Sequence, residues 1–233
     1  MHNIDNSGLS ADWGPVGILF DCDGVLVDSE PALAEIAAIA LHDFGAAAIP
    51  EDFKPYIGMG EDMYIGEVTA KYGVVFDETI KHHVYEKYVE LAANFVHPFP
   101  GMRDLLIRLK SAGCRIAVAS SADQIKVTTN LGLLNLPAEF FDAVITGSDI
   151  ERKKPFPDIY LLASRKCQVT PDRCFVVEDA VSGIQSGKAA GMTCIGFTSS
   201  HTAEELRTAG ADIIVDDIRD IWSSIELFNR PAN

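Results

Sequence analysis

Two aspartates directly follow a short apolar stretch near the start of the chain. Residues 16–20 are apolar or glycine and lead into Asp21, Cys22, Asp23 and Gly24. A continuous apolar run of this length is typical of a strand buried on both faces of a parallel sheet. In extended backbone the two aspartates leave the same face, and the glycine then permits a tight turn. Because carboxylates this close repel each other, the pattern predicts a divalent cation and a nucleophile, with a solvated turn as the alternative.

Further polar residues stand at the ends of other expected strands. They are Ser120, Glu178 and Asp179, together with Lys154 in a cationic loop. Taken singly, each has a structural explanation, the serine and the acidic pair as helix caps and the lysine as a solvated charge. The carboxyl ends of parallel strands, however, lie at one edge of a sheet, where doubly wound folds bind ligands. Because these polar residues are expected at the same edge of the sheet, the sequence predicts that they form a single site.

The rest of the chain alternates between extended and helical patterns. Strands are expected at 115–119, 143–146, 174–178, 193–197 and 212–215, and helices at 102–112, 122–131, 157–166, 181–190, 202–209 and 218–228. This order predicts an α/β fold with a doubly wound, Rossmann-like parallel sheet.

The stretch 30–96 has a helical pattern throughout, with Ser29 as the expected N-cap of its first helix. It is too long for an ordinary crossover between parallel strands. We therefore expect an inserted all-helical cap domain, with hinges near 28–31 and 97–101. The core domain would then comprise 16–29 and 97–229, and 1–15 would be an N-terminal extension.

Composition limits the class of protein. The chain has 233 residues, 48% hydrophobic content and a formal net charge of −15, which suits a packed core and disfavours nucleic acid or anionic membranes as partners. The sequence shows no bilayer-spanning stretch and no signal peptide. Its five cysteines form no C-x-x-C pair, which favours buried reduced thiols. We expect a cytoplasmic protein, and a monomer because no apolar stripe is left unassigned.

These motifs resemble those of the haloacid dehalogenase-like hydrolase superfamily, in the helical-cap branch that includes β-phosphoglucomutases and related phosphatases. The first family motif corresponds to residues 21–29, the second to Ser120, the third to Lys154 with Pro155, and the fourth to Glu178 and Asp179 with Gly183. The four motifs occur in the family's order and cover nearly the whole chain from Val16 to the final helix.

The resemblance implies a role for each residue. Asp21 would attack phosphorus to form an aspartyl-phosphate, and Asp23 would act first as general acid and then as general base. Mg²⁺ would be bound by Asp21, Asp179 and the backbone carbonyl of Asp23, with Glu178 either a direct ligand or a partner of a metal-bound water. Ser120 and Lys154 would hold the phosphoryl oxygens. The other expected phosphate- or substrate-binding residues are Cys22, Gly24, Ser121 and, in the cap, Glu61.

The residues also separate the reactions of the superfamily. Dehalogenases of this fold use no metal and lack the second acid of the first motif, whereas this chain has both Asp23 and Asp179. A phosphonatase would need a cap lysine for a Schiff base, for which Lys54 is available, but it typically lacks an acid at position 23. We therefore expect a Mg²⁺-dependent phosphatase acting on a small phosphorylated metabolite.

A sugar phosphomutase of the β-phosphoglucomutase type is the main alternative. That subfamily has a basic residue and an asparagine at the positions of Asp123 and Gln124, an arginine at that of Glu61, and a hinge histidine at that of Leu33. An anion about 5 Å from a second phosphate costs on the order of 1–4 kcal/mol, so these replacements favour a simple phosphatase. A non-catalytic binding module is a third alternative, which the intact acidic residues oppose.

Overall fold

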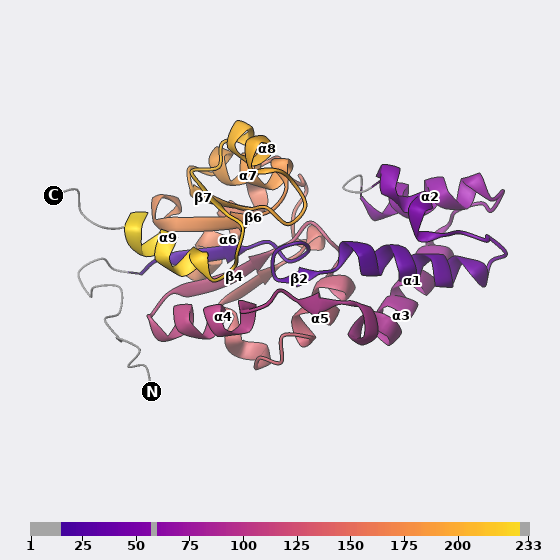
Figure 1. The fold of residues 1–233 in the computed structure, drawn as a ribbon, viewed down its shortest axis with the longest axis horizontal. Helices are drawn as coiled ribbons and strands as arrows, with labels where there is room; N and C mark the ends of the chain where they lie inside the picture. Colours follow the sequence, from indigo (N-terminus) through magenta and orange to yellow (C-terminus); the bar gives the residue numbers. More distant parts are fainter. Residues whose placement is uncertain (1–14, 57–59, 229–233) are drawn as a thin grey trace.

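The computed structural model describes residues 15–56 and 60–228, in which a parallel β-sheet is covered by helices on both faces (Figure 1). The strand order is β5-β4-β1-β6-β7-β8, and every neighbouring pair is parallel. The predicted doubly wound α/β fold is thereby confirmed. The sheet grows outward from β1 on both sides, so the end of β1 lies at the switch in strand order where such folds bind ligands.

The predicted strands and helices recur in the expected order, with small shifts at their ends. The strands of the sheet are β1 (Gly17–Phe20), β4 (Arg115–Ala119), β5 (Ala143–Ile145), β6 (Cys174–Glu178), β7 (Thr193–Phe197) and β8 (Ile213–Val215). The helices around it are α4 (Met102–Ser111), α5 (Gln124–Gly132), α6 (Asp158–Cys167), α7 (Val181–Ala189), α8 (Ala203–Ala209) and α9 (Asp220–Phe228). Short 3-10 helices are η3 (Ala138–Phe140), η4 (Gly147–Asp149) and η5 (Pro171–Arg173).

The side chains of β1 alternate between two apolar layers. Leu19 packs in the layer that contains α6, α7 and α8, whereas Ile18 and Phe20 pack in the layer that contains α4, α5 and α9. Because both layers are apolar, β1 is buried on both faces, which explains its unbroken apolar sequence. Beyond its end, the backbone N–H of Asp21 still donates to the carbonyl of Val177 at 3.0 Å. The strand edge therefore fixes the position of Asp21.

Residues 30–96, which we call the cap segment, lie beyond the carboxyl edge of the sheet (Figure 1). The segment contains α1 (Glu30–His42), the 3-10 helix η2 (Pro50–Tyr56), α2 (Glu61–Lys71) and α3 (Glu78–Phe95). At its base, β2 (Val27–Asp28) and β3 (His97–Pro98) pair antiparallel, a ribbon too short to show an alternating pattern in the sequence. The apolar layer of α4 and α5 continues into α1 and α3. That the segment is a separate domain stays a prediction.

Ser29 occupies the predicted N-cap position of α1, but its side chain has another partner. It precedes α1, but no side-chain hydrogen bond caps this helix. The Ser29 hydroxyl donates to the carboxylate of Asp23 instead. Pro31 in the first turn has no N–H that requires a partner, which lessens the need for a cap.

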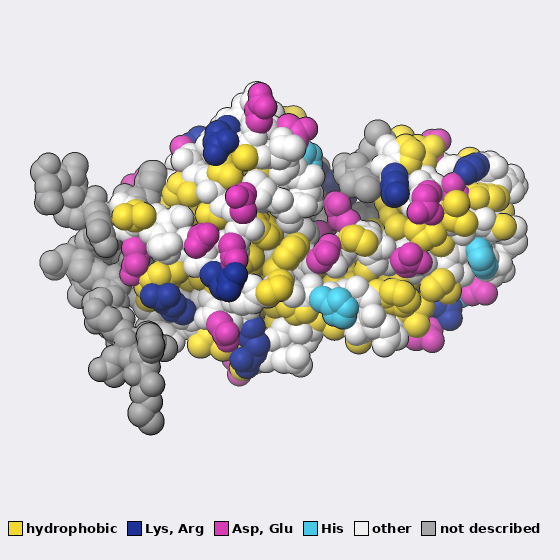
Figure 2. All heavy atoms as spheres, viewed as in Figure 1, with side chains coloured by type: hydrophobic (Ala, Val, Ile, Leu, Met, Phe, Trp, Pro, Cys, Tyr) yellow, Lys and Arg dark blue, Asp and Glu magenta, His cyan; other side chains and the backbone are white. Residues whose placement is uncertain are grey.

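The surface and the cysteines agree with the composition. All five cysteines are buried and unpaired, as predicted. On the face shown in Figure 2, lysine and arginine side chains lie between acidic ones and form no continuous basic patch. Within residues 15–56 and 60–228, no helix has the length and apolar character needed to pass through a bilayer.

Candidate active site

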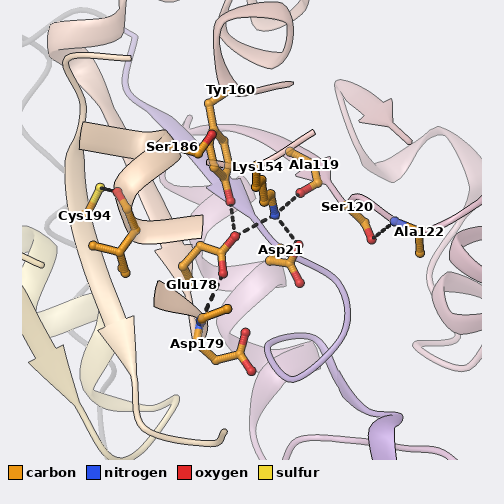
Figure 3. A network of polar contacts seen from close by, with 12 residues as sticks. Asp21, Ala119, Ser120, Ala122, Lys154, Tyr160, Glu178, Asp179, Ser186 and Cys194 are labelled. Atoms are coloured by element: carbon orange, nitrogen blue, oxygen red, sulfur yellow. Dashed lines mark hydrogen bonds and ion pairs between the residues drawn. The ribbon is translucent and has the colours of Figure 1, made fainter. Parts of the chain in front are cut away.

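Lys154 joins the ends of three strands through its ammonium group (Figure 3). Nζ donates to Oδ1 of Asp21 at 2.5 Å, to Oε1 of Glu178 at 2.6 Å and to the carbonyl of Ala119 at 2.9 Å. These three acceptors lie at the ends of β1, β6 and β4. Burial alone would lower the pKa of Lys154, but the two carboxylates outweigh it and raise the pKa above its ordinary value. Lys154 is therefore a permanent buried cation.

Glu178 is buried, and both its carboxylate oxygens accept hydrogen bonds from the protein. Oε1 accepts from Lys154 and, at 2.6 Å, from the hydroxyl of Tyr160, while Oε2 accepts from the next two backbone N–H groups at 3.2 and 3.3 Å. A Cβ at Gly183 would lie 1.9 Å from Oε1, so that position must be glycine. Of the two expected roles of Glu178, this geometry favours the indirect one over direct metal ligation.

Asp179 packs closely against the turn at Gly24. Its Oδ2 accepts from the hydroxyls of Ser200 at 2.5 Å and Ser199 at 3.3 Å. Gly24 has a φ of +75°, and a Cβ there would lie 2.0 Å from Oδ2 of Asp179. Glycine thus permits both the turn and the close approach of the carboxylate. Gly24 thus leaves space for the carboxylate, and its backbone N–H donates to the carbonyl of Val27 at 2.8 Å. Its role in binding phosphate stays a prediction.

Three buried acidic side chains, Asp21, Glu178 and Asp179, each offer a carboxylate oxygen within 4.8 Å of the others. Burial raises the pKa of Asp21 to about 7. The Lys154 ammonium opposes this rise, and the charges of Glu178 and Asp23 add to it. Burial and the charges of Glu178 and Asp21 raise the pKa of Asp179 well above its usual value. A hard divalent cation fits this cluster, because it prefers oxygen ligands and offsets the repulsion. Since Glu178 is already saturated, Asp21 and Asp179 are the side chains left for a metal.

Asp23 has polar neighbours that the sequence did not single out. Besides the hydroxyl of Ser29, its Oδ1 contacts Nδ2 of Asn130 at 3.1 Å and Nζ of Lys126 at 3.0 Å. Lys126 and Asn130 lie four residues apart on α5 and therefore share one face of that helix. Both are buried. A lysine and an asparagine at helical spacing beside apolar Val127 were the signal in the sequence that could have identified them.

The remaining predicted phosphate-binding residues differ in what they present to the site. Ser120 is buried, and its Oγ accepts the N–H of Ala122 at 3.2 Å (Figure 3). The hydroxyl of Ser121 is buried without a hydrogen-bond partner among the described residues. The Cys22 side chain is fully buried in the apolar core, so only its backbone can contact a ligand. Glu61 begins α2, but its side chain lies outside what the structure describes.

Comparison with known proteins places this arrangement in a family. The sequence model for haloacid dehalogenase-like hydrolases matches residues 18–197. The chain belongs to this family. It is 32% identical over 181 residues to 6-phosphogluconate phosphatase of Escherichia coli, covering 77% of this chain and 81% of that protein.

Two further similarities bear on this hydrolase. It is 37% identical over 218 residues to Protein SUPPRESSOR OF QUENCHING 1, chloroplastic, of Arabidopsis thaliana; the match covers 90% of this chain but only 20% of that protein. A solved structure of a putative β-phosphoglucomutase from Thermotoga maritima has a TM-score of 0.78 and 27% identity, covering 91% of this chain and 99% of the other. Proteins similar to this chain are thus named for different reactions, one as a phosphatase and another as a phosphomutase.

In this hydrolase Asp123 connects α5 to the cap segment. Its carboxylate accepts from the hydroxyl of Tyr85 at 2.9 Å and pairs with Lys81 at 3.2 Å, and both partners lie on α3. Burial alone would raise the pKa of Asp123, but Tyr85 and Lys81 lower it below its usual value. The charge of Asp123 is therefore compensated in this conformation. Of the two carboxylates expected to repel a second phosphate, only Glu61 keeps that role as a prediction.

The raised pKa of Asp21 gives a prediction for the pH dependence of stability without metal. An unfolded aspartate has a pKa of roughly 3.9, whereas that of folded Asp21 is about 7. Between these values the unfolded chain has released a proton that the folded protein retains, so stability falls as the pH rises. In EDTA we expect the melting temperature to decrease from pH 5 to pH 7.5. Asp21→Asn should make this decrease shallower, and equal slopes in the two proteins would contradict the assignment.

Proposed function

We propose that this hydrolase is a Mg²⁺-dependent phosphatase that releases phosphate from a small phosphomonoester through an aspartyl-phosphate on Asp21. The observation that carries the proposal is the convergence of Asp21, Asp179 and Lys154 at one buried edge of the sheet. Carboxylate oxygens for a metal beside a fixed cation suit a dianionic phosphoryl group. The name of the Escherichia coli relative, a phosphatase of a sugar-acid phosphate, supports the same class of substrate.

Two aspartates would share the chemistry. The bond from a carboxylate oxygen of Asp21 to phosphorus forms as the bond from phosphorus to the leaving oxygen breaks. Asp23 gives its proton to that leaving oxygen, and then takes a proton from the water that attacks phosphorus and releases phosphate. Lys154 restrains Asp21 through Oδ1, so the nucleophile needs little reorientation.

Other residues would bind the phosphoryl group and the metal. Asp21, Asp179 and the backbone carbonyl of Asp23 would hold Mg²⁺, which when bound neutralises charge on the phosphoryl oxygens. Ser120 would donate its hydroxyl proton to a remaining phosphoryl oxygen. Lys154, whose three donors are engaged in this conformation, would exchange one of its present acceptors for another phosphoryl oxygen. Both are buried or nearly so, and hydrogen bonds to a developing charge are stronger where water is excluded. A cytoplasmic location and a monomeric state stay predictions.

Substitutions of the acidic residues test the proposal. Asp21→Asn should abolish Mg²⁺-supported hydrolysis of 4-nitrophenyl phosphate, because an amide is not a nucleophile for phosphorus. Asp179→Ala should abolish turnover or raise the Mg²⁺ requirement, because it removes a metal ligand. Ca²⁺ should inhibit the wild-type protein, since its larger and looser shell disfavours the in-line geometry. Phosphate release is measured alongside melting temperature.

A matched control for these variants is Asp217→Asn, which changes a carboxylate whose hydrogen bonds come from exposed Arg219 and not from a residue assigned to the site. It should keep wild-type activity. Full activity of Asp21→Asn, or an unchanged Mg²⁺ requirement in Asp179→Ala, would contradict the assigned site.

The cap segment is proposed to act as a lid that excludes water from the phosphoryl group. Its only two chain connections pass through the ribbon of β2 and β3. Small-angle scattering with Mg²⁺ and a phosphate mimic such as orthovanadate should show a more compact particle than without them. Identical scattering curves in both states would rule out closure as a rigid body.

A sugar phosphomutase is the second candidate, favoured by the likeness to the putative β-phosphoglucomutase and by the compensated charge of Asp123. Glucose 1-phosphate with a trace of sugar bisphosphate separates the two reactions. We expect inorganic phosphate to be released and little glucose 6-phosphate to form. Stoichiometric isomerisation without phosphate release would make the protein a mutase.

A further inference from the structure

The carboxylate of Asp23 is held through one of its two oxygens. The hydroxyl of Ser29, the amide of Asn130 and the ammonium of Lys126 all point to Oδ1. Ser29 lies before α1, whereas Asn130 and Lys126 come from α5 in the core. The three groups therefore approach the same atom from different parts of the chain.

This convergence makes the two oxygens of Asp23 chemically different. An oxygen that accepts from an ammonium, an amide and a hydroxyl is the unprotonated one, because a proton on it would compete with all three donors. When Asp23 carries a proton, the proton is therefore placed on Oδ2. Oδ2 is then the atom that serves as the acid.

Tyr88 fixes the direction in which the Asn130 amide points. The hydroxyl of Tyr88 donates to Oδ1 of Asn130 at 2.7 Å, and both side chains are fully buried. With its oxygen so engaged, the amide presents Nδ2 to Asp23. A reversed amide would place two oxygens against each other at the 3.1 Å contact. Since Tyr88 lies on α3, the cap segment contributes to the orientation of Asp23.

We propose that Lys126 and Asn130 are positioning residues for Asp23, with Tyr88 orienting Asn130. They hold Oδ1 as an acceptor and thereby direct the proton on Oδ2 to the leaving oxygen. In this step the bond from Asp21 to phosphorus forms, the bond from phosphorus to the leaving oxygen breaks, and the proton of Oδ2 passes to that oxygen. The inference rests on the proposed function, in which Asp23 is the general acid.

The role predicts a dependence on the leaving group that a purely structural role would not produce. An alkoxide leaving group needs protonation as the bond to phosphorus breaks, whereas 4-nitrophenolate leaves readily without it. Misplacing the proton should therefore slow the hydrolysis of alkyl phosphates and spare that of 4-nitrophenyl phosphate. The ratio kcat/KM reports this first step for each substrate.

The experiment compares kcat/KM for 4-nitrophenyl phosphate, phenyl phosphate and an alkyl phosphate such as glycerol phosphate. Lys126→Met removes the ammonium and keeps an apolar stem of similar length. Tyr88→Phe removes only the hydroxyl that orients Asn130, and therefore retains the packing if the first variant folds poorly. We expect Lys126→Met to lose about tenfold or more on the alkyl ester and less than about threefold on 4-nitrophenyl phosphate, with a smaller bias of the same sign for Tyr88→Phe.

Tyr85→Phe is the matched control. It also removes a tyrosine hydroxyl from the contact between α3 and α5, but this hydroxyl donates to Asp123 and not to Asn130. This variant should change kcat/KM for all three substrates by the same factor. If kcat/KM fell equally on all substrates in Lys126→Met and Tyr88→Phe, or fell in neither variant, the positioning role would be overturned. The proposed phosphatase function would not be affected by that result. A wild-type protein inactive on every ester would instead overturn the proposed function and this inference with it.

Discussion

The buried hydrogen bonds of Lys154 are the interaction on which the rest of the site depends. One ammonium group holds Asp21, Glu178 and the carbonyl of Ala119, and so links the ends of β1, β6 and β4. Removing one partner from a buried ion pair typically costs roughly 3–5 kcal/mol, because the other charge is left without compensation. The surrounding constraints follow from this requirement. Tyr160 completes the bonding of Glu178, and Gly183 leaves room for its carboxylate.

The two aspartates after β1 are stabilised by different cations. Asp21 contacts Lys154, which precedes α6, and Asp23 contacts Lys126 on α5. Because α6 and α5 belong to the apolar layers on opposite faces of the sheet, the two lysines reach the strand end from opposite sides. This arrangement reduces the repulsion of two neighbouring carboxylates without placing both on one cation. It also allows Asp21, the proposed nucleophile, and Asp23, the proposed general acid, to be oriented independently.

Polar side-chain contacts, in addition to the polypeptide backbone, connect the cap segment to the rest of the protein. Tyr85 and Lys81 of α3 contact Asp123, and Tyr88 of the same helix contacts Asn130. A movement of α3 away from α5 would break these contacts and release the amide that holds Asp23. The position of the cap segment and the orientation of the Asp23 carboxylate are therefore physically linked.

Local sequence determined the fold class and most of the site. Apolar runs that end in Asp21, Ser120 and Glu178 were enough, because parallel strands bring their carboxyl ends to one edge regardless of side-chain detail. The same reasoning placed Lys154 at that edge, since its loop leads into the helix after β5.

The tertiary structure decided how these side chains are used. In the folded protein the Ser29 hydroxyl donates to Asp23 and does not cap the helix. Glu178 accepts hydrogen bonds from Lys154 and Tyr160, and Asp123 pairs with Lys81. The tertiary structure also brought Lys126 and Asn130 to Asp23 across more than a hundred residues of chain. Hydrogen bonds of this kind depend on distances of a few ångströms between elements remote in sequence. A local pattern specifies which face of a helix is polar, and only the packing of that helix decides which partner the face meets.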